Sequence, residues 1–198
     1  MIDHNLILAS GSPRRRQLLE IVGIDFEVIP AATDETPQPK EKPLAFARRA
    51  SREKALDVAS RYPDRPVLGA DTVVEVDSAI LGKPRSTEDA AEMLRSLSGR
   101  THLVHTALAL VVDGQCHDVV DSAQVEFVDL SEEMIRWYVA TGEPMDKAGA
   151  YGVQGIGGLF VVRVGGSPHT VVGLPVHRLP ELFANADLDF WAELNRPT

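Results

Sequence analysis

The stretch Val67-Leu-Gly-Ala-Asp-Thr-Val-Val-Glu-Val76 decides how the rest of the chain is arranged. Aliphatic and β-branched residues surround a Gly69-Ala70 pair, which predicts a buried strand that is bent or closely approached at its middle. Asp71 is out of place there, because an unpaired ionised carboxylate in a core is costly. We therefore expect Asp71 to face a cation, a metal or water in a cleft. The alternative is an aspartate that closes a turn between two strands.

A turn and a second short apolar run follow this strand and predict a hairpin. Asp77-Ser78 suits the turn, and Ala79-Ile-Leu81 suits the returning strand. The hairpin would bring Lys83, two residues further on, within reach of Asp71. We expect the two side chains to belong to one site.

Composition limits the class of protein. The chain has 198 residues, of which 44% are hydrophobic and 25% charged, so we expect one globular domain over residues 1–198. The net charge of -9 argues against a general nucleic-acid or anionic-membrane binder, so any anionic ligand has to be met by local cations. The single Cys116, the lack of a basic leader and the lack of an apolar span of about 20 residues favour a cytoplasmic protein.

Near the N-terminus, a strand-like run over residues 6–9 leads through a Gly-Ser turn into a helix. Ser12 is a natural N-cap and Pro13 a natural first residue of that helix. The first turn then carries three arginines, Arg14-Arg-Arg16, which have the wrong sign for the helix dipole. Solvated surface arginines are the usual explanation, but backbone N–H groups and guanidinium groups here also suit phosphate.

Two further charged groups interrupt otherwise ordinary segments. An acidic turn over residues 33–37 follows a strand, so Asp34 or Glu35 is a candidate metal ligand, although acidic loops are normally just solvated. Lys54 falls on the apolar stripe of a helix predicted over residues 44–60. It either snorkels to the surface or points into a cleft as a phosphate ligand.

The remaining elements follow from periodicity, capping residues and turn signals. We expect helices over residues 86–99 and 131–142, and a closing helix from Val171 through Phe183. Strands are expected over residues 26–30, 101–112, 116–120, 122–128 and 159–164. His102 and His105 are an odd number of residues apart on one strand, which places them on opposite faces and argues against joint metal ligation.

A glycine-rich stretch, residues 143–158, combines five glycines with polar Asp146, Lys147, Tyr151 and Gln154. So many glycines indicate a loop whose backbone turns sharply or comes close to a ligand. A flexible surface loop is the alternative, but the strand expected next favours an ordered one. The pattern matches neither a P-loop nor a dinucleotide-binding fingerprint.

Six short motifs occur in order over nearly the whole chain. They are Ala9-Ser-Gly-Ser-Pro-Arg-Arg15, Gly69-Ala-Asp-Thr72, Leu81-Gly-Lys-Pro84, Leu97-Ser-Gly99, Glu143-Pro-Met-Asp-Lys-Ala-Gly-Ala-Tyr-Gly-Val-Gln-Gly155 and Val172-Gly-Leu-Pro175. Each is weak alone, but together they closely resemble the successive motifs of the Maf family of nucleoside triphosphate pyrophosphatases.

This resemblance implies an elongated α/β fold, in which helices flank a mixed twisted sheet and two lobes surround a central cleft. It implies a relationship to the inosine triphosphate pyrophosphatases and, often, a homodimer. The implied activity is cytoplasmic hydrolysis of a nucleoside triphosphate to the monophosphate and pyrophosphate with a divalent metal, Mg²⁺ or Mn²⁺. Nucleotide-pool cleansing and cell-division arrest are the cellular roles that the resemblance suggests.

The resemblance also implies roles for single residues. Asp71 matches the proton acceptor of the family, Lys54 and Lys83 are expected to assist catalysis, and Glu35 is expected to hold the metal with Asp71. Residues expected to bind the substrate are Ser10, Arg14, Arg15, Thr72 and Gln154, of which Arg14, Thr72 and Gln154 match positions linked to substrate choice.

Two features resemble the dTTP/UTP branch of the family, namely the threonine after Asp71 and the run over residues 146–154. A hydroxyl at Thr72 and an amide at Gln154 can donate to and accept from a uracil-type ring. Two alternatives stay open. One is the same reaction on 7-methyl-GTP or a modified purine triphosphate, and the other is a non-catalytic nucleotide-binding regulator of septum formation. Arg16 and Ser167-Pro-His169 depart from the family pattern without touching the catalytic assignment.

Overall fold

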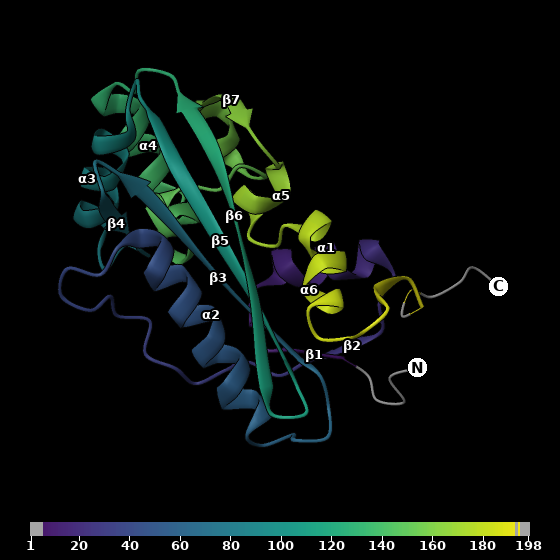
Figure 1. The fold of residues 1–198 in the computed structure, drawn as a ribbon. Coiled ribbons are helices and arrows are strands. Elements are labelled where there is room, and N and C mark those ends of the chain that lie inside the picture. The colour runs from purple at the N-terminus through teal and green to yellow at the C-terminus, as the bar shows by residue number, and fades with distance from the viewer. Residues whose placement is uncertain (1–5, 193, 195–198) are drawn as a thin grey trace.

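Three long strands run the length of the molecule in the computed structural model, which describes residues 6–192 and 194 (Figure 1). They are β3 (Val67–Val76), β5 (Thr101–Val112) and β6 (Gln115–Phe127), and they pair antiparallel. The shorter strands are β1 (Leu6–Leu8), β2 (Phe26–Val28), β4 (Ala79–Leu81) and β7 (Val161–Gly165). The order is β2-β1-β3-β5-β6-β7, with β4 beside β3, and β1 is parallel to both neighbours. The predicted mixed twisted sheet is confirmed.

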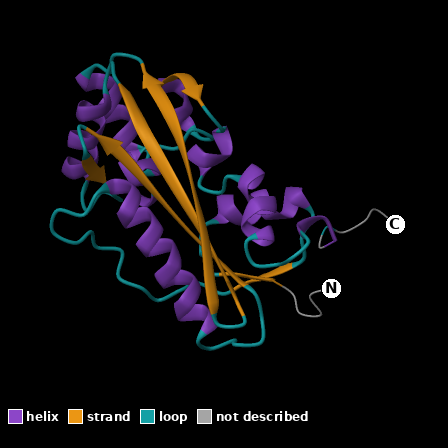
Figure 2. Cartoon of the chain, viewed as in Figure 1, coloured by secondary structure: helices purple, strands orange, loops and turns teal. Residues whose placement is uncertain are grey.

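The longest helix, α2 (Pro43–Ala59), crosses one face of β3 and β5 (Figure 2). Its backbone comes so close to β3 that a Cβ added at Gly69 would lie 2.4 Å from the carbonyl oxygen of Ser51 and 2.8 Å from the amide nitrogen of Ala55. This contact confirms the close approach predicted at the middle of the strand. It also fixes which side chains of α2 lie beside which side chains of β3.

The other helices are α1 (Pro13–Val22), α3 (Thr87–Leu97), α4 (Glu132–Ala140), α5 (Pro168–Val172) and α6 (Leu179–Ala184). They form two groups, with α3 and α4 toward the upper end of the long strands, α1 and α6 beside the middle of these strands, and α5 between the groups (Figure 1). Side chains such as Leu19 and Phe183 pack into one hydrophobic core around α1 and α6. Leu94, Tyr138 and Phe160 pack into another core around α3 and α4. The fold thus has the two expected lobes.

Between the lobes, one edge of β3 is left open. On this side β1 pairs with Val67 and Leu68, whereas β4 pairs with residues 74–76. Among the described residues, none forms a strand partner for residues 69–73 on that edge. Asp71 lies in this open segment. The edge of a sheet between two short strands is therefore available to a ligand.

The structure corrects three element predictions. The closing helix is interrupted, because Gly173 adopts φ 112° and Pro175 follows, so α5 ends there and α6 begins only at Leu179. The two strands expected over residues 116–120 and 122–128 are one continuous strand, β6. Finally, residues 156–160 form a 3₁₀ turn before β7 begins at Val161.

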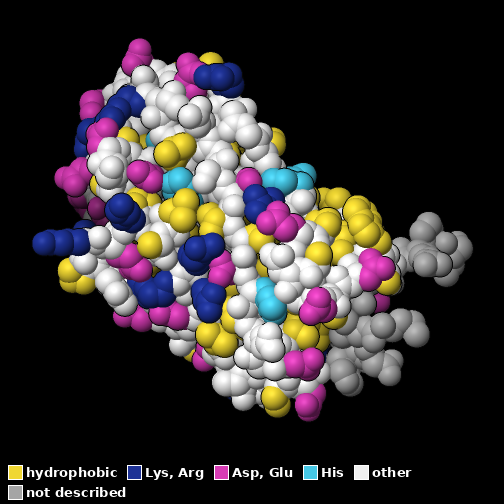
Figure 3. Space-filling model, viewed as in Figure 1, with side chains coloured by type: hydrophobic (Ala, Val, Ile, Leu, Met, Phe, Trp, Pro, Cys, Tyr) yellow, Lys and Arg dark blue, Asp and Glu magenta, His cyan; other side chains and the backbone are white. Residues whose placement is uncertain are grey.

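Surface charge is mixed in sign. Figure 3 shows Lys and Arg side chains interspersed with Asp and Glu over the face that it draws. Within residues 6–192 and 194, no helix has the length and apolar character that a membrane crossing requires.

Candidate active site

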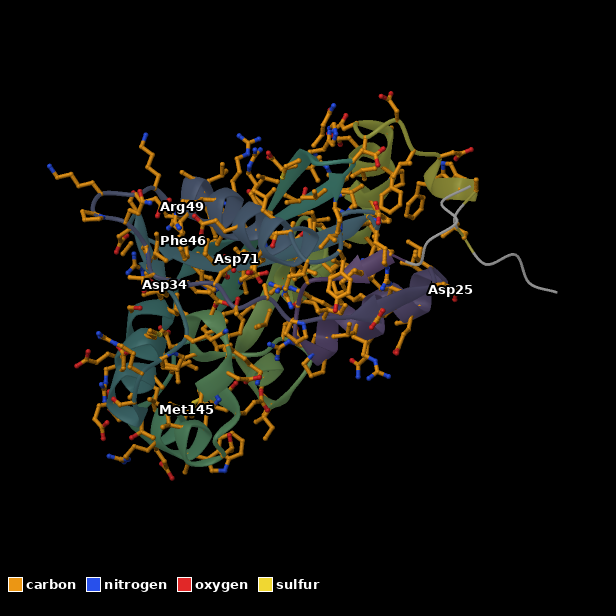
Figure 4. The ribbon with its side chains drawn as sticks, turned by 90° about the horizontal axis from the view of Figure 1, so that it is seen from below. Asp25, Asp34, Phe46, Arg49, Asp71 and Met145 are labelled. Atoms are coloured by element: carbon orange, nitrogen blue, oxygen red, sulfur yellow. The ribbon has the colours of Figure 1, made fainter. Side chains whose placement is uncertain are left out.

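A cleft of about 1050 Å³ lies between the two lobes. It is lined by all nine residues that the sequence places in the site, namely Ser10, Arg14, Arg15, Glu35, Lys54, Asp71, Thr72, Lys83 and Gln154. Asp71 lies near the centre of the molecule in Figure 4, with Phe46 and Arg49 on one side and Met145 of the other lobe on the opposite side. Segments that are far apart in the sequence therefore meet in one cavity.

Four alternating charges form a row along the cleft. The ammonium of Lys54 on α2 lies 2.6 Å from Asp71 Oδ1 and 2.8 Å from Glu35 Oε1. The ammonium of Lys83 lies 3.2 Å from the other Glu35 oxygen, so Lys83 joins the site through Glu35 and not through a direct pair with Asp71. Lys54 does not snorkel to the surface, because the approach of α2 at Gly69 points its side chain into the cleft.

Burial separates the two carboxylates chemically. Asp71 is only 5% exposed, and burial raises its pKa against the opposing charges of Lys54 and Arg15. Burial also acts to raise the pKa of Glu35, but hydrogen bonds and charges from Lys54 and Lys83 outweigh it and bring the pKa to about 2. At neutral pH Glu35 is therefore a fixed negative charge, whereas Asp71 holds a proton more readily than an ordinary aspartate. The second property suits a general base.

The three arginines of α1 have three different environments. Arg15 turns inward and donates to Ser10 Oγ at 3.0 Å, to the Ala70 carbonyl at 2.9 Å, to the Gly173 carbonyl at 2.9 Å and to Thr72 Oγ1 at 3.1 Å. Arg16 is exposed and pairs with Glu20 on the same helix. Arg14 lines the cleft. Arg15 lines the cleft as well, but these four protein acceptors take up its guanidinium, which leaves Arg14 as the better candidate for a phosphate.

Glu143 holds the glycine-rich loop in shape. Its carboxylate accepts hydrogen bonds from the backbone N–H groups of Ile156 at 2.9 Å and Gly157 at 3.1 Å, and from the hydroxyl of Tyr138 at 2.9 Å. These contacts position Gln154 on the cleft wall and confirm that the loop is ordered.

Sequence reasoning missed several cleft residues. The ammonium of Lys147 is anchored 2.6 Å from Asp146 Oδ1 and 2.7 Å from the Glu143 carbonyl, and both charged side chains line the cleft. Arg85, Asp89 and Glu92, at the start of α3, line it as well. The polar pair 146–147 inside a glycine-rich loop was a usable signal. Nothing in the local pattern of α3 distinguishes these residues from an ordinary solvated helix face.

The two histidines are structural. His102 Nε2 lies 2.9 Å from the hydroxyl of Tyr151, and His105 is held between Glu75 at 2.8 Å and Ser122 at 2.7 Å. Neither lines the cleft, and they lie on opposite faces of β5. The opposite faces agree with the alternation predicted for this strand.

Whether the cleft can hold a metal ion depends on the donor atoms that its side chains offer. Among the described residues no group of three or more His, Cys, Asp and Glu side chains is arranged for a metal ion. However, Asp71 and Glu35 already hold one cation, the Lys54 ammonium, between them. Two carboxylates with substrate phosphates are the donor set typical of Mg²⁺. The residues therefore fit a divalent cation that is bound together with a phosphate ligand.

Comparison with known proteins matches the family model "Maf-like protein" over residues 5–186. The dTTP/UTP pyrophosphatase of Escherichia coli (strain K12) is 50% identical over 182 residues, which cover 91% of this chain and 92% of that protein. A nucleoside triphosphate pyrophosphatase of Shigella flexneri matches at the same identity and coverage. Among solved structures, a HAM1 protein from Coxiella burnetii aligns with a TM-score of 0.43 at 18% identity, covering 63% of this chain and 73% of that chain.

Proposed function

The chain belongs to the Maf family, and we propose on this basis that it hydrolyses dTTP and UTP to the nucleoside monophosphate and pyrophosphate. The observation that carries the proposal is the row Asp71, Lys54, Glu35 and Lys83 in a cleft large enough for a nucleotide. Two of these charges, Asp71 and Lys54, are buried, and a buried ion pair is costly to maintain for stability alone. A triphosphate and its counterion give them a use.

We propose that the triphosphate lies along the cations of the cleft. It brings about four negative charges, which the global charge of the protein does not attract, so local groups have to offset them. Arg14, Lys54, Lys83 and Lys147 reach the cavity from both lobes. The N-terminus of α1, next to Ser10, adds backbone N–H groups and the positive end of its dipole.

Hydrolysis requires attack of water on the α-phosphorus and departure of pyrophosphate. Asp71 accepts the proton of the attacking water, a role supported by its burial and raised pKa. Lys54 lies beside the carboxylate and offsets negative charge as it moves toward the leaving group. Water attack breaks the bond between the α-phosphorus and the bridging oxygen, and the electron pair leaves with pyrophosphate.

Asp71 and Glu35 would hold a divalent cation, Mg²⁺ or Mn²⁺, together with the substrate phosphates. Such a cation, when bound, neutralises phosphate charge and lowers the pKa of coordinated water. Holding it would require Lys54 to give up at least part of its contact with the two carboxylates. The ammonium would then be free to meet the phosphates.

Pyrophosphate release by the purified protein tests this function. The substrates are the common nucleoside triphosphates and 7-methyl-GTP, each with Mg²⁺ or Mn²⁺. We expect release mainly from dTTP and UTP. Release from a purine alone would leave the reaction but refute the substrate, and nucleotide binding without release on any substrate would refute the enzyme.

A further inference from the structure

We propose that Thr106, a buried residue outside the cleft, fixes the hydroxyl of Thr72 as a hydrogen-bond acceptor and thereby selects bases with a ring N–H. Uracil and thymine have such an N–H at N3, and cytosine does not. This inference rests on the proposed function and specifies which atom of the base is read. Thr106 is a positioning residue, because it acts through Thr72 without touching the substrate.

The first step concerns the proton of Thr106. Its hydroxyl lies 2.7 Å from the carbonyl oxygen of Thr170, and a carbonyl can only accept. The single hydroxyl proton of Thr106 is therefore committed to Thr170. Thr106 is fully buried, so no water competes for this bond.

The second step concerns the contact between the two threonines. Thr72 and Thr106 are directly opposite in the register of β3 and β5, and their Oγ1 atoms are 2.9 Å apart. Because Thr106 has no proton left, Thr72 has to donate its own to Thr106. The hydroxyl of Thr72 also accepts a hydrogen bond from Arg15 at 3.1 Å.

The third step counts the hydrogen bonds that the hydroxyl of Thr72 can make. A hydroxyl has one proton and two lone pairs, and Thr72 uses the proton and one lone pair within the protein. It has one lone pair left for a ligand, and it lines the cleft. The absence of a side chain at Gly173 keeps the approach open, since a Cβ there would lie 3.0 Å from Thr72 Oγ1.

An acceptor fixed in this way discriminates at one position of a pyrimidine. Uracil and thymine present N3–H, which donates to the lone pair, whereas N3 of cytosine is itself a lone pair and is repelled. The amide of Gln154 offers both a donor and an acceptor, so it satisfies either base and does not decide between them. Guanine has a ring N–H as well, so its exclusion has to come from the size of its ring system.

The test measures kcat/KM for UTP and for CTP in the wild type and in Thr106→Val. The valine keeps the shape and strand propensity of threonine but removes its hydroxyl. Thr72 is then free to turn its proton toward the ligand, so the preference for UTP over CTP should fall by about tenfold or more. Thr106→Ala removes the same hydroxyl with less bulk and should give the same change if the valine variant does not fold.

The matched control is Thr170→Val, which is equally buried and loses a hydroxyl that donates to Asp121. It keeps the main-chain carbonyl that fixes Thr106, so its UTP to CTP ratio should equal that of the wild type. An unchanged ratio in both Thr106 variants would overturn the inference, as would an equal change in Thr170→Val. A wild type that releases no pyrophosphate from UTP would instead refute the proposed function from which the inference starts.

Discussion

Replacement of Asp71 by asparagine should separate catalysis from binding and folding. The amide keeps the shape of the side chain but accepts a proton poorly, so we expect kcat to fall by about 10²–10⁴-fold. KM should change only a few-fold, because the proposed phosphate ligands Arg14, Lys83 and Lys147 are untouched. The assay is pyrophosphate release from UTP at saturating metal.

The cost in stability should be small for a buried ion pair. Breaking such a pair usually costs about 3–5 kcal/mol, because the remaining charge is left without a partner. Here Lys54 keeps its ion pair with Glu35 at 2.8 Å. A neutral amide is also less costly to bury than the carboxylate of Asp71, whose pKa is raised by burial. We therefore expect a loss of about 1–2 kcal/mol in the free energy of unfolding, measured by urea denaturation.

Asp118→Asn is the matched control. Asp118 is also a poorly exposed carboxylate between two cations, at 2.6 Å from both Arg48 and Arg52 on α2, but it does not line the cleft. The same substitution should lower stability there and leave turnover unchanged. Turnover of Asp71→Asn within a few-fold of the wild type would remove Asp71 from the mechanism, and equal losses in both variants would attribute the effect to folding.

Three further predictions concern the sheet that carries the site. Gly69→Ala should prevent folding or cost several kcal/mol, because its Cβ would lie 2.4 Å from the Ser51 carbonyl oxygen, whereas Gly82→Ala meets nothing within 4 Å and should be tolerated; urea midpoints decide this. Burial lowers the pKa of His102 to about 4, so the unfolded chain binds more protons between pH 4 and 6.5 and stability should fall by about 3 kcal/mol as pH drops across that window. A His102→Gln variant should lack this part of the pH dependence, and equal slopes would contradict it. Ser122→Ala removes a contact to a buried imidazole on the sheet and should leave pyrophosphate release unchanged in the same assay, since this serine does not line the cleft.

Three of the candidate site residues were predictable because each stands out against its own segment, whereas Ser10, Arg15, Thr72 and Gln154 were expected only from the resemblance to the family. Asp71 interrupts an apolar strand, Lys54 interrupts an apolar helical stripe, and Arg14 sits at the wrong end of a helix dipole. A local pattern does not tell which of these charges meet. The contact between Lys54 and Asp71 depends on how closely α2 packs on β3, and Gly69 only indicates that something approaches.

The features that sequence did not reveal depend on partners distant in the chain. Arg15 is indistinguishable from Arg14 by sequence, yet its guanidinium is taken up by Ala70, Thr72 and Gly173. Gly173 also ends α5 in a left-handed conformation, which broke the expected closing helix. Long-range hydrogen bonds therefore decide which arginine turns inward, whereas the break in the closing helix follows from the local backbone preferences of Gly173 and Pro175.

Asp71 and Thr72 are adjacent on β3, and this adjacency fixes where the proposed proton acceptor lies relative to the proposed base reader. Asp71 points to the face covered by α2, where Lys54 meets it, and Thr72 points to the opposite face, where Arg15 meets it. Both reach the same cleft because the edge of β3 is open between β1 and β4. Successive residues of a strand are about 3.3 Å apart, so the proposed proton acceptor, Asp71, and the proposed base reader, Thr72, are held at a fixed spacing by the backbone itself. A register slip of one residue would exchange their faces, and the pairing of β3 with β5, which runs unbroken through nine residue pairs, opposes such a slip.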